Sequence, residues 1–180
     1  MCGGVVMTSG SDAGVGYGFQ RKYLLLMCIT GLLLSLDQIS KLYVHTQFQL
    51  HESVAVIGNI FSITYVRNFG AAFGFLAHTP EIFRELFFLI IPPAACGIIL
   101  YIMRSIKNSD TRQIMALSSI FAGALGNYLD RLQFRYVIDF LDFRYGEYSW
   151  PAFNVADMAI VGGVLFLSLL MLKEVKKPQA

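Results

Sequence analysis

Four stretches without a single charged residue constrain this 180-residue chain more than any other feature. They cover residues 23–36, 86–103, 113–129 and 158–172. Apolar residues make up 56% of the chain and charged residues only 14%, where soluble domains average roughly 45–50% and 25%. A soluble domain this short has too much surface to cover with so few charges. The composition therefore indicates an integral membrane protein and argues against a disordered chain or a secreted disulfide scaffold.

Each charge-free stretch is shorter than the roughly 20 residues that a membrane-spanning helix needs. Extending each one gives four predicted spans at about 23–44, 83–104, 113–132 and 154–173. The extensions bring in Asp37, Lys41, Asp130 and Asp157 near the helix ends, within one or two turns of the membrane surface. We expect a membrane all-α fold with four transmembrane helices.

The basic residues predict how these helices are oriented. One side of the membrane would hold eight Lys and Arg against three acidic residues, and the other side six against nine. The more basic side should face the cytoplasm, which puts both termini inside. The net charge of only +2 gives no basic field for nucleic acid. All the acidic residues within the spans then lie at the outer ends of the helices.

Two segments between the spans should lie outside the cell membrane. Residues 48–76 are rich in β-branched and aromatic residues around a Gly58-Asn59 turn, which predicts a small external β-sheet, or cradle. Residues 134–151 are predicted to form an aromatic-rich external loop at the membrane interface. Residues 1–20 are rich in Gly and Ser and should be a flexible tail, and residues 21–177 a single membrane-embedded domain.

Acidic residues within spans are costly and are candidates for a functional site. Asp37 and Lys41 are four residues apart on one helix face, so the favoured interpretation is a self-neutralising pair, with site support as the alternative. Asp130 precedes Arg131 and lies near Arg135, which favours a salt-bridged scaffold role over catalysis.

Asp139 and Asp157 have no such evident partner. Asp139 lies in an apolar run, and Asp157 precedes 15 uncharged residues. Asp157 could simply cap a helix that begins at Asn154, because acidic side chains favour a first turn. A pair of aspartates can also hydrolyse a peptide bond, since one carboxylate activates water while the other donates a proton. At this point both interpretations remain open.

Other intramembrane hydrolase chemistries lack their residues. A zinc protease needs two His in an H-E-x-x-H pattern, whereas His51-Glu52 is followed by Ser53-Val54-Ala55. The three cysteines contain no C-x-x-C spacing, and Ser40 and Lys41 are adjacent on a helix and diverge. We expect no metal and no cofactor.

Five short blocks, in order along the chain, resemble a known family: the bacterial lipoprotein signal peptidases, or signal peptidase II. They match the family patterns D-Q-x-x-K, N-x-G-A-A-F, G-N-x-x-D-R, V-x-D-F and F-N-x-A-D at Asp37–Lys41, Asn68–Phe73, Gly126–Arg131, Val137–Phe140 and Phe153–Asp157. Any one block is a weak signal, but five at these spacings are specific. The match runs from about residue 23 to 173.

The resemblance implies an aspartic endopeptidase of the bacterial inner membrane with its active site near the outer leaflet. Its substrate would be a prolipoprotein carrying a diacylglyceryl group on Cys, and cleavage would fall just before that Cys. Membrane lipid would be a partner, and cyclic peptides of the globomycin type possible inhibitors. By the match, Asp139 and Asp157 are catalytic. The binding or site-supporting residues are Asp37, Lys41, Asn68, Gly70, Gly126, Asn127, Asp130, Arg131 and Asn154.

Two functions of other classes are the alternatives. A small transporter would use the acids to bind a cation or proton, and a structural membrane subunit would use them to dock helices. Transporter acids are expected near mid-membrane, often within repeated halves of the chain. Here the acids gather at one end of the predicted spans and no repeat is visible, so a peptidase is favoured.

Overall fold

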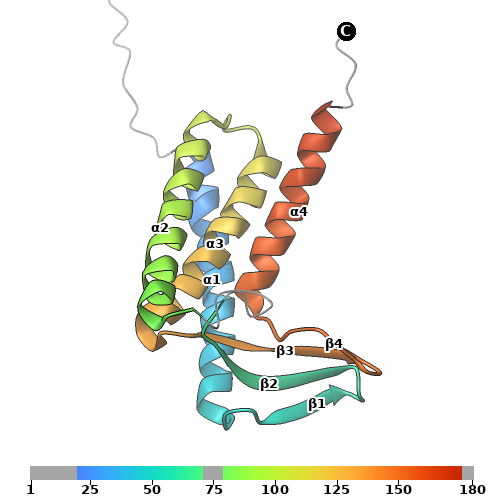
Figure 1. Cartoon of the computed structure of the whole chain (residues 1–180). Coiled ribbons are helices and arrows are strands. Elements are labelled where there is room, and N and C mark those ends of the chain that lie inside the picture. Colours follow the sequence, from blue (N-terminus) through green and yellow to red (C-terminus); the bar gives the residue numbers. More distant parts are fainter. Residues whose placement is uncertain (1–19, 71–78, 176–180) are drawn as a thin grey trace, which may run out of the picture.

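Four long helices form a bundle with a small antiparallel sheet across one end in the computed structural model (Figure 1). The structure describes residues 20–70 and 79–175, so the predicted tail lies almost wholly outside the described residues. The elements follow in the order α1 (Arg21–Gln47), β1 (Ser53–Ile57), β2 (Phe61–Asn68), α2 (Glu81–Ser105), α3 (Thr111–Phe134), β3 (Val137–Tyr145), β4 (Tyr148–Ser149) and α4 (Val155–Val175).

Each of the four helices contains one of the charge-free stretches of the sequence and extends beyond it at both ends. Three of them are long and apolar enough to cross a membrane: α1, α2, and α4 over Val155–Lys173. Their outer faces carry exposed large apolar side chains, including Leu32, Ile90, Ile98, Val161 and Leu169. Such faces are expected where lipid rather than water surrounds a helix.

Helix α3 lies at the centre of the bundle and contacts all three other helices (Figure 1). It is 24 residues long but less apolar than the others, since it also carries the Gly126–Arg131 block. Glycines let its neighbours approach closely. A Cβ on Gly126 would lie 2.6 Å from Asp37 Oδ2, and one on Gly163 of α4 would lie 2.7 Å from Ile120 Cγ1. Helix α3 accordingly buries many of its residues, among them Ile114, Leu117 and Asp130, although Met115 and Leu132 remain exposed.

The sheet has the strand order β1-β2-β3-β4 and lies at the end of the bundle where α4 begins. The predicted turn at Gly58 is confirmed: β1 and β2 pair as an antiparallel hairpin around it, and the φ of +44° at Gly58 suits glycine. Residues 137–145, predicted to belong to a loop, instead form β3 and pair with β2, with Asn68 opposite Val137. The usual alternation of apolar and polar residues is hard to see in this strand, because the strand is buried on both faces near its start.

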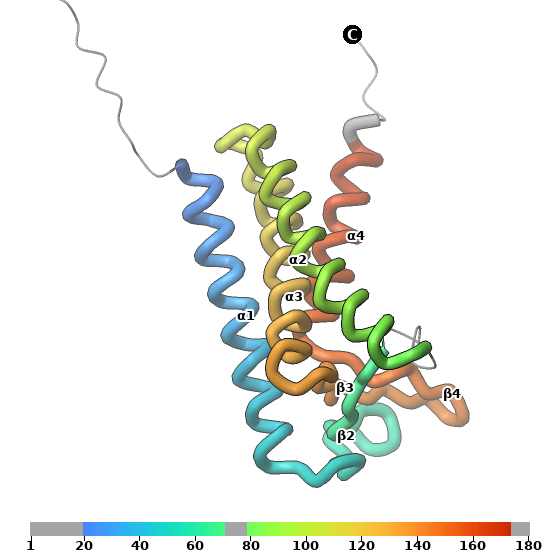
Figure 2. The backbone as a smooth tube through the Cα atoms, turned by 60° about the vertical axis from the view of Figure 1, so that its left-hand side comes forward, coloured from blue at the N-terminus to red at the C-terminus, as the bar shows by residue number. Residues whose placement is uncertain are grey.

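A second apolar cluster joins the sheet to α1. Val44 of α1 packs with Tyr65 of β2 and with Ile138 and Phe140 of β3. Both ends of the described chain, at Arg21 of α1 and at Val175 of α4, lie at the opposite end of the bundle (Figure 2). The sheet end and the basic end of the molecule are therefore separated by the length of the helices.

Candidate active site

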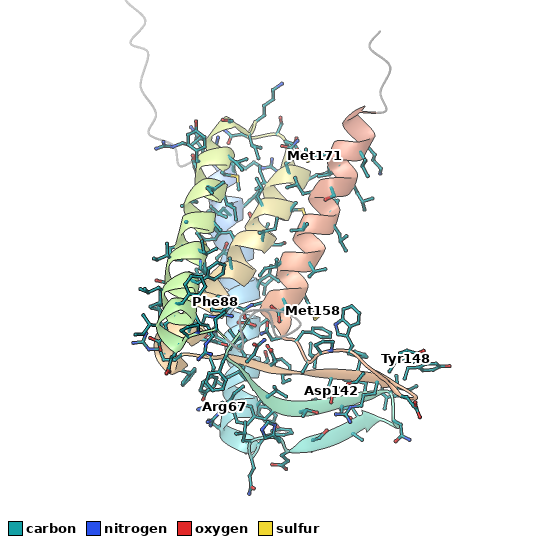
Figure 3. All side chains as sticks on the ribbon, in the orientation of Figure 1. Arg67, Phe88, Asp142, Tyr148, Met158 and Met171 are labelled. Carbon is teal, nitrogen blue, oxygen red and sulfur yellow. The ribbon has the colours of Figure 1, made fainter. Side chains whose placement is uncertain are left out.

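Helix α4 begins with a reciprocal cap that fixes two predicted site residues. Asn154 Oδ1 accepts a hydrogen bond from the backbone N–H of Asp157 at 2.9 Å. Asp157 Oδ2 in turn accepts one from the backbone N–H of Asn154 at 3.2 Å. The expected helix cap is thus confirmed. This end of α4, marked by Met158, lies over the sheet (Figure 3).

Asp139 reaches the same place from strand β3. Its Oδ1 accepts a hydrogen bond from Asn154 Nδ2 at 2.7 Å, and its Oδ2 accepts one from Asn68 Nδ2 at 2.9 Å. The residue is only 2% exposed, and Asn154 is fully buried. Asp139 and Asp157 therefore both bond to Asn154, although they come from a strand and a helix.

The environment of Asp139 favours its protonated form. Burial away from water raises the pKa of this carboxyl to about 7, and the negative charge of Asp157 adds to the shift. The hydrogen bonds from Asn68 and Asn154 work in the opposite direction. Near neutral pH a substantial fraction of Asp139 side chains consequently hold a proton.

A buried ion cluster lies beside these two carboxylates. Lys41 Nζ of α1 is 2.7 Å from Asp37 Oδ2 and 3.0 Å from Asp130 Oδ2 of α3. All three side chains are almost fully buried. The predicted ion pair between Asp37 and Lys41 is confirmed. The prediction for Asp130 was wrong. Sequence proximity had suggested Arg131 or Arg135, whereas Asp130 pairs with Lys41 because α1 and α3 pack together.

Asn127 connects the ion cluster to the carboxylate pair. Its Oδ1 accepts hydrogen bonds from Lys41 Nζ at 3.0 Å and from Asn154 Nδ2 at 3.1 Å. Its Nδ2 donates to Asp157 Oδ1 at 2.8 Å. Because Lys41 is a cation and must donate, the orientation of this amide is determined, and the amide nitrogen faces Asp157. The ion cluster thus ensures that Asp157 meets the amide nitrogen of Asn127 and not its oxygen.

Arg131 holds the chain just after β2. Its Nη2 donates to Gly70 O at 2.8 Å, and its guanidinium lies over the Phe88 ring, 4.1 Å from the centroid. Figure 3 shows Phe88 at the sheet end of α2. Gly70 N donates to Asn68 Oδ1 at 3.0 Å, which leaves the amide nitrogen of Asn68 to face Asp139. The rest of this block, residues 71–73, lies outside the described residues.

One participating side chain was quoted within a motif but not proposed as a site residue. Gln38 Nε2 donates to Asp130 Oδ1 at 3.0 Å, to Asp37 Oδ2 at 3.1 Å and to Gly126 O at 3.3 Å. A polar amide inside a predicted span was the available signal. The nine supporting residues predicted from the sequence all take part in or border this network, with Gly126 supplying the space for Asp37.

The arrangement presents two neighbouring carboxyls, of which one favours its protonated form, beside a fixed positive charge. Such a pair can act as a proton donor and a proton acceptor in the same reaction. Within residues 20–70 and 79–175, no three His, Cys, Asp or Glu side chains gather in a way that could hold a metal ion.

Comparison with known proteins gives a consistent result. A family described as "Signal peptidase (SPase) II" matches residues 29–173. The protein named lipoprotein signal peptidase of Syntrophus aciditrophicus (strain SB) is 51% identical over 158 residues, which cover 87% of this chain and 98% of that protein. Its namesake in Geobacter sulfurreducens is 44% identical over 144 residues, covering 80% and 89%.

A solved structure of a bacterial membrane enzyme has the same fold. It is 31% identical, has a TM-score of 0.77, and the match covers 86% of this chain and 93% of that one. The family match spans most of the chain and includes all five sequence blocks. This chain therefore belongs to the signal peptidase II family of membrane peptidases.

Proposed function

We propose that this chain is an aspartic endopeptidase that removes the signal peptide from diacylglyceryl-modified prolipoproteins, cleaving just before the lipidated Cys. The observation that carries the proposal is the convergence of Asp139 and Asp157 on Asn154. The relatives' name, lipoprotein signal peptidase, supports the substrate class. A transporter or a structural subunit would have no need for two carboxyls that converge on one buried amide.

The two aspartates would divide the chemistry between them. Asp157 lies in the first turn of α4, where the helix dipole favours negative charge, and it takes a proton from a water molecule as that water attacks the scissile carbonyl carbon. Asp139, with its pKa raised to about 7, gives its proton to the carbonyl oxygen. The tetrahedral intermediate then collapses: one of its hydroxyls returns a proton to Asp139 as the carbonyl re-forms, the C–N bond breaks, and the proton held by Asp157 passes to the leaving amine.

The charges and the fold support a position for this chain in the membrane. We place α3 across the bilayer as a fourth span, since its central position shields its polar residues from lipid. The basic end of the bundle would face the cytoplasm with both termini, and the sheet would lie at the outer surface of the inner membrane. The acyl chains of a substrate can then stay in the bilayer while its scissile bond meets Asp139 and Asp157.

The test is cleavage of a diacylated prolipoprotein by Asp139→Asn and Asp157→Asn. Each substitution keeps the size of the side chain but removes its acid or base function, so cleavage should fall by at least about 10³-fold. Glu147→Gln is the matched control, because this exposed residue in the β3–β4 turn loses the same charge without touching the site. Near-normal cleavage by both aspartate variants would overturn the proposal.

A further inference from the structure

A cavity at the basic end of the bundle lies far from the two aspartates. It has a volume of about 620 Å³ and opens between the α2–α3 turn, the start of α3 and the end of α4. Figure 3 marks this end of α4 by Met171, opposite the sheet. The volume falls in the range of small-ligand pockets. Nothing in the proposed peptidase chemistry uses this cavity.

Three cations from three different segments line the cavity. They are Lys107 of the α2–α3 turn, Arg112 in the first turn of α3 and Lys173 near the end of α4. All three are exposed, so their charged groups are accessible. Among the described side chains, Asp110 is the only acidic residue in the lining, and its Oδ1 already accepts a hydrogen bond from Gln113 N at 3.1 Å. The cavity therefore has an excess of positive charge.

Contacts from α1 hold the turn that forms one wall. Lys22 Nζ donates to the backbone oxygens of Arg104 at 2.8 Å and Ile106 at 3.0 Å. Arg21 donates to Asn108 O at 2.9 Å and to Thr111 Oγ1 at 3.1 Å. The Thr111 hydroxyl accepts this bond, so its own hydrogen remains available to a ligand. The wall is thus fixed before any ligand arrives.

From these features we infer that the cavity binds an anionic phosphate group. Three cations in one lining and a hydroxyl donor suit phosphate oxygens, and half-buried Leu170 gives the cavity an apolar border along α4. At the cytoplasmic surface, the nearest abundant phosphates are the headgroups of acidic phospholipids, whose acyl chains would lie along α4. Free inorganic phosphate is the other source of the same chemistry.

Lipid binding to the purified full-length protein tests this inference. Wild type in phosphatidylcholine nanodiscs should retain added phosphatidylglycerol, counted by native mass spectrometry, and its Tm should rise with the phosphatidylglycerol content. Each cation removed should weaken binding by about fivefold, so Arg112→Gln/Lys173→Gln should bind roughly 25-fold more weakly. High salt should have a similar effect on wild type.

Arg104→Gln is the matched control, since Arg104 lies at the same end of the bundle but outside the cavity lining. It should bind phosphatidylglycerol like wild type. Equal Tm values of all variants in pure phosphatidylcholine, together with equal cleavage rates in detergent, would show that the fold is intact. A Tm rise with inorganic phosphate alone, lost in the double variant, would assign the cavity to free phosphate.

Two results would overturn the inference. One is equal binding by wild type and the double variant, which would show that the cavity contributes nothing. The other is an equal loss in Arg104→Gln, which would show a general effect of surface charge.

Discussion

Four aspartates at the sheet end of the bundle form two regions with different partners. Asp37 and Asp130 share the ammonium group of Lys41. The side-chain donors to Asp139 and Asp157 are instead the neutral amides of Asn68, Asn127 and Asn154. Asn127 belongs to both regions, because it accepts from Lys41 and donates to Asp157.

The difference shows how one residue type serves structure in one place and chemistry in another. An aspartate in contact with a buried cation is a fixed anchor between helices. An aspartate held by amides can gain or lose a proton without breaking an ion pair, because its hydrogen-bond donors are neutral. The charged region therefore orients the amides, and the amides orient the carboxyls that are proposed to react.

The largest expected effect comes from breaking the charged region. Lys41→Met leaves Asp37 and Asp130 without their cation in a buried position, so we expect the free energy of unfolding to drop by about 3–5 kcal/mol. Thermal or denaturant unfolding in detergent micelles measures this. The triple variant Asp37→Asn/Lys41→Met/Asp130→Asn should recover most of the loss. A single variant as stable as wild type would contradict the role assigned to Lys41.

The amide-held region should instead make stability depend on pH through Asp139. Its pKa of about 7 in the folded protein exceeds the value of about 4 in an unfolded chain. The folded state therefore holds more protons between these values, and stability should fall by about 4 kcal/mol as pH rises from 4 to 7. Asp139→Asn should remove this dependence, because an amide does not titrate in this pH range. Unfolding measured at pH 4.5 and 7.5 distinguishes the two proteins, and an unchanged slope in the variant would exclude Asp139 as its source.

The smallest effect concerns a single amide. Asn68 donates to Asp139 and lowers the pKa of that carboxyl, so Asn68→Ala should raise it. Cleavage should then decline at a pH about one unit higher than in wild type, where it declines above about 7 as Asp139 loses its proton. A profile of kcat/KM against pH measures the shift. Ser62→Ala, on the same strand, should leave the profile in place, and a downward shift in Asn68→Ala would contradict the assignment.

Most of the helical architecture could be predicted because it depends on local composition. The four helices lie where charge-free stretches lie, and Asn154 and Asp157 cap α4 as their spacing indicated. The Gly58 turn and its hairpin were also visible in the sequence. The five motif blocks contain the polar side chains that the structure brings to the two regions, including Gln38, which was not proposed as a site residue.

The parts that were missed depend on contacts between distant residues. Strand β3 was expected to be a loop. Its partner β2 lies some 70 residues earlier, and no local sequence pattern indicates that the two strands pair. Asp130 was assigned to its sequence neighbours, yet the packing of α1 against α3 brings Lys41 to it. Arg135 instead lies 3.8 Å from Glu85 at an exposed position.

The sequence by itself determined that the chain forms apolar helices with polar residues at one end, because hydrophobic length and charge position are properties of each segment alone. It also carried the five blocks that assign the family. Only the tertiary structure decided which acid meets a cation and which meets an amide, since the helix and strand ends that supply these groups approach one another only after packing. That choice, made around Asn127 and Asn154, separates the two anchoring aspartates from the pair proposed to react.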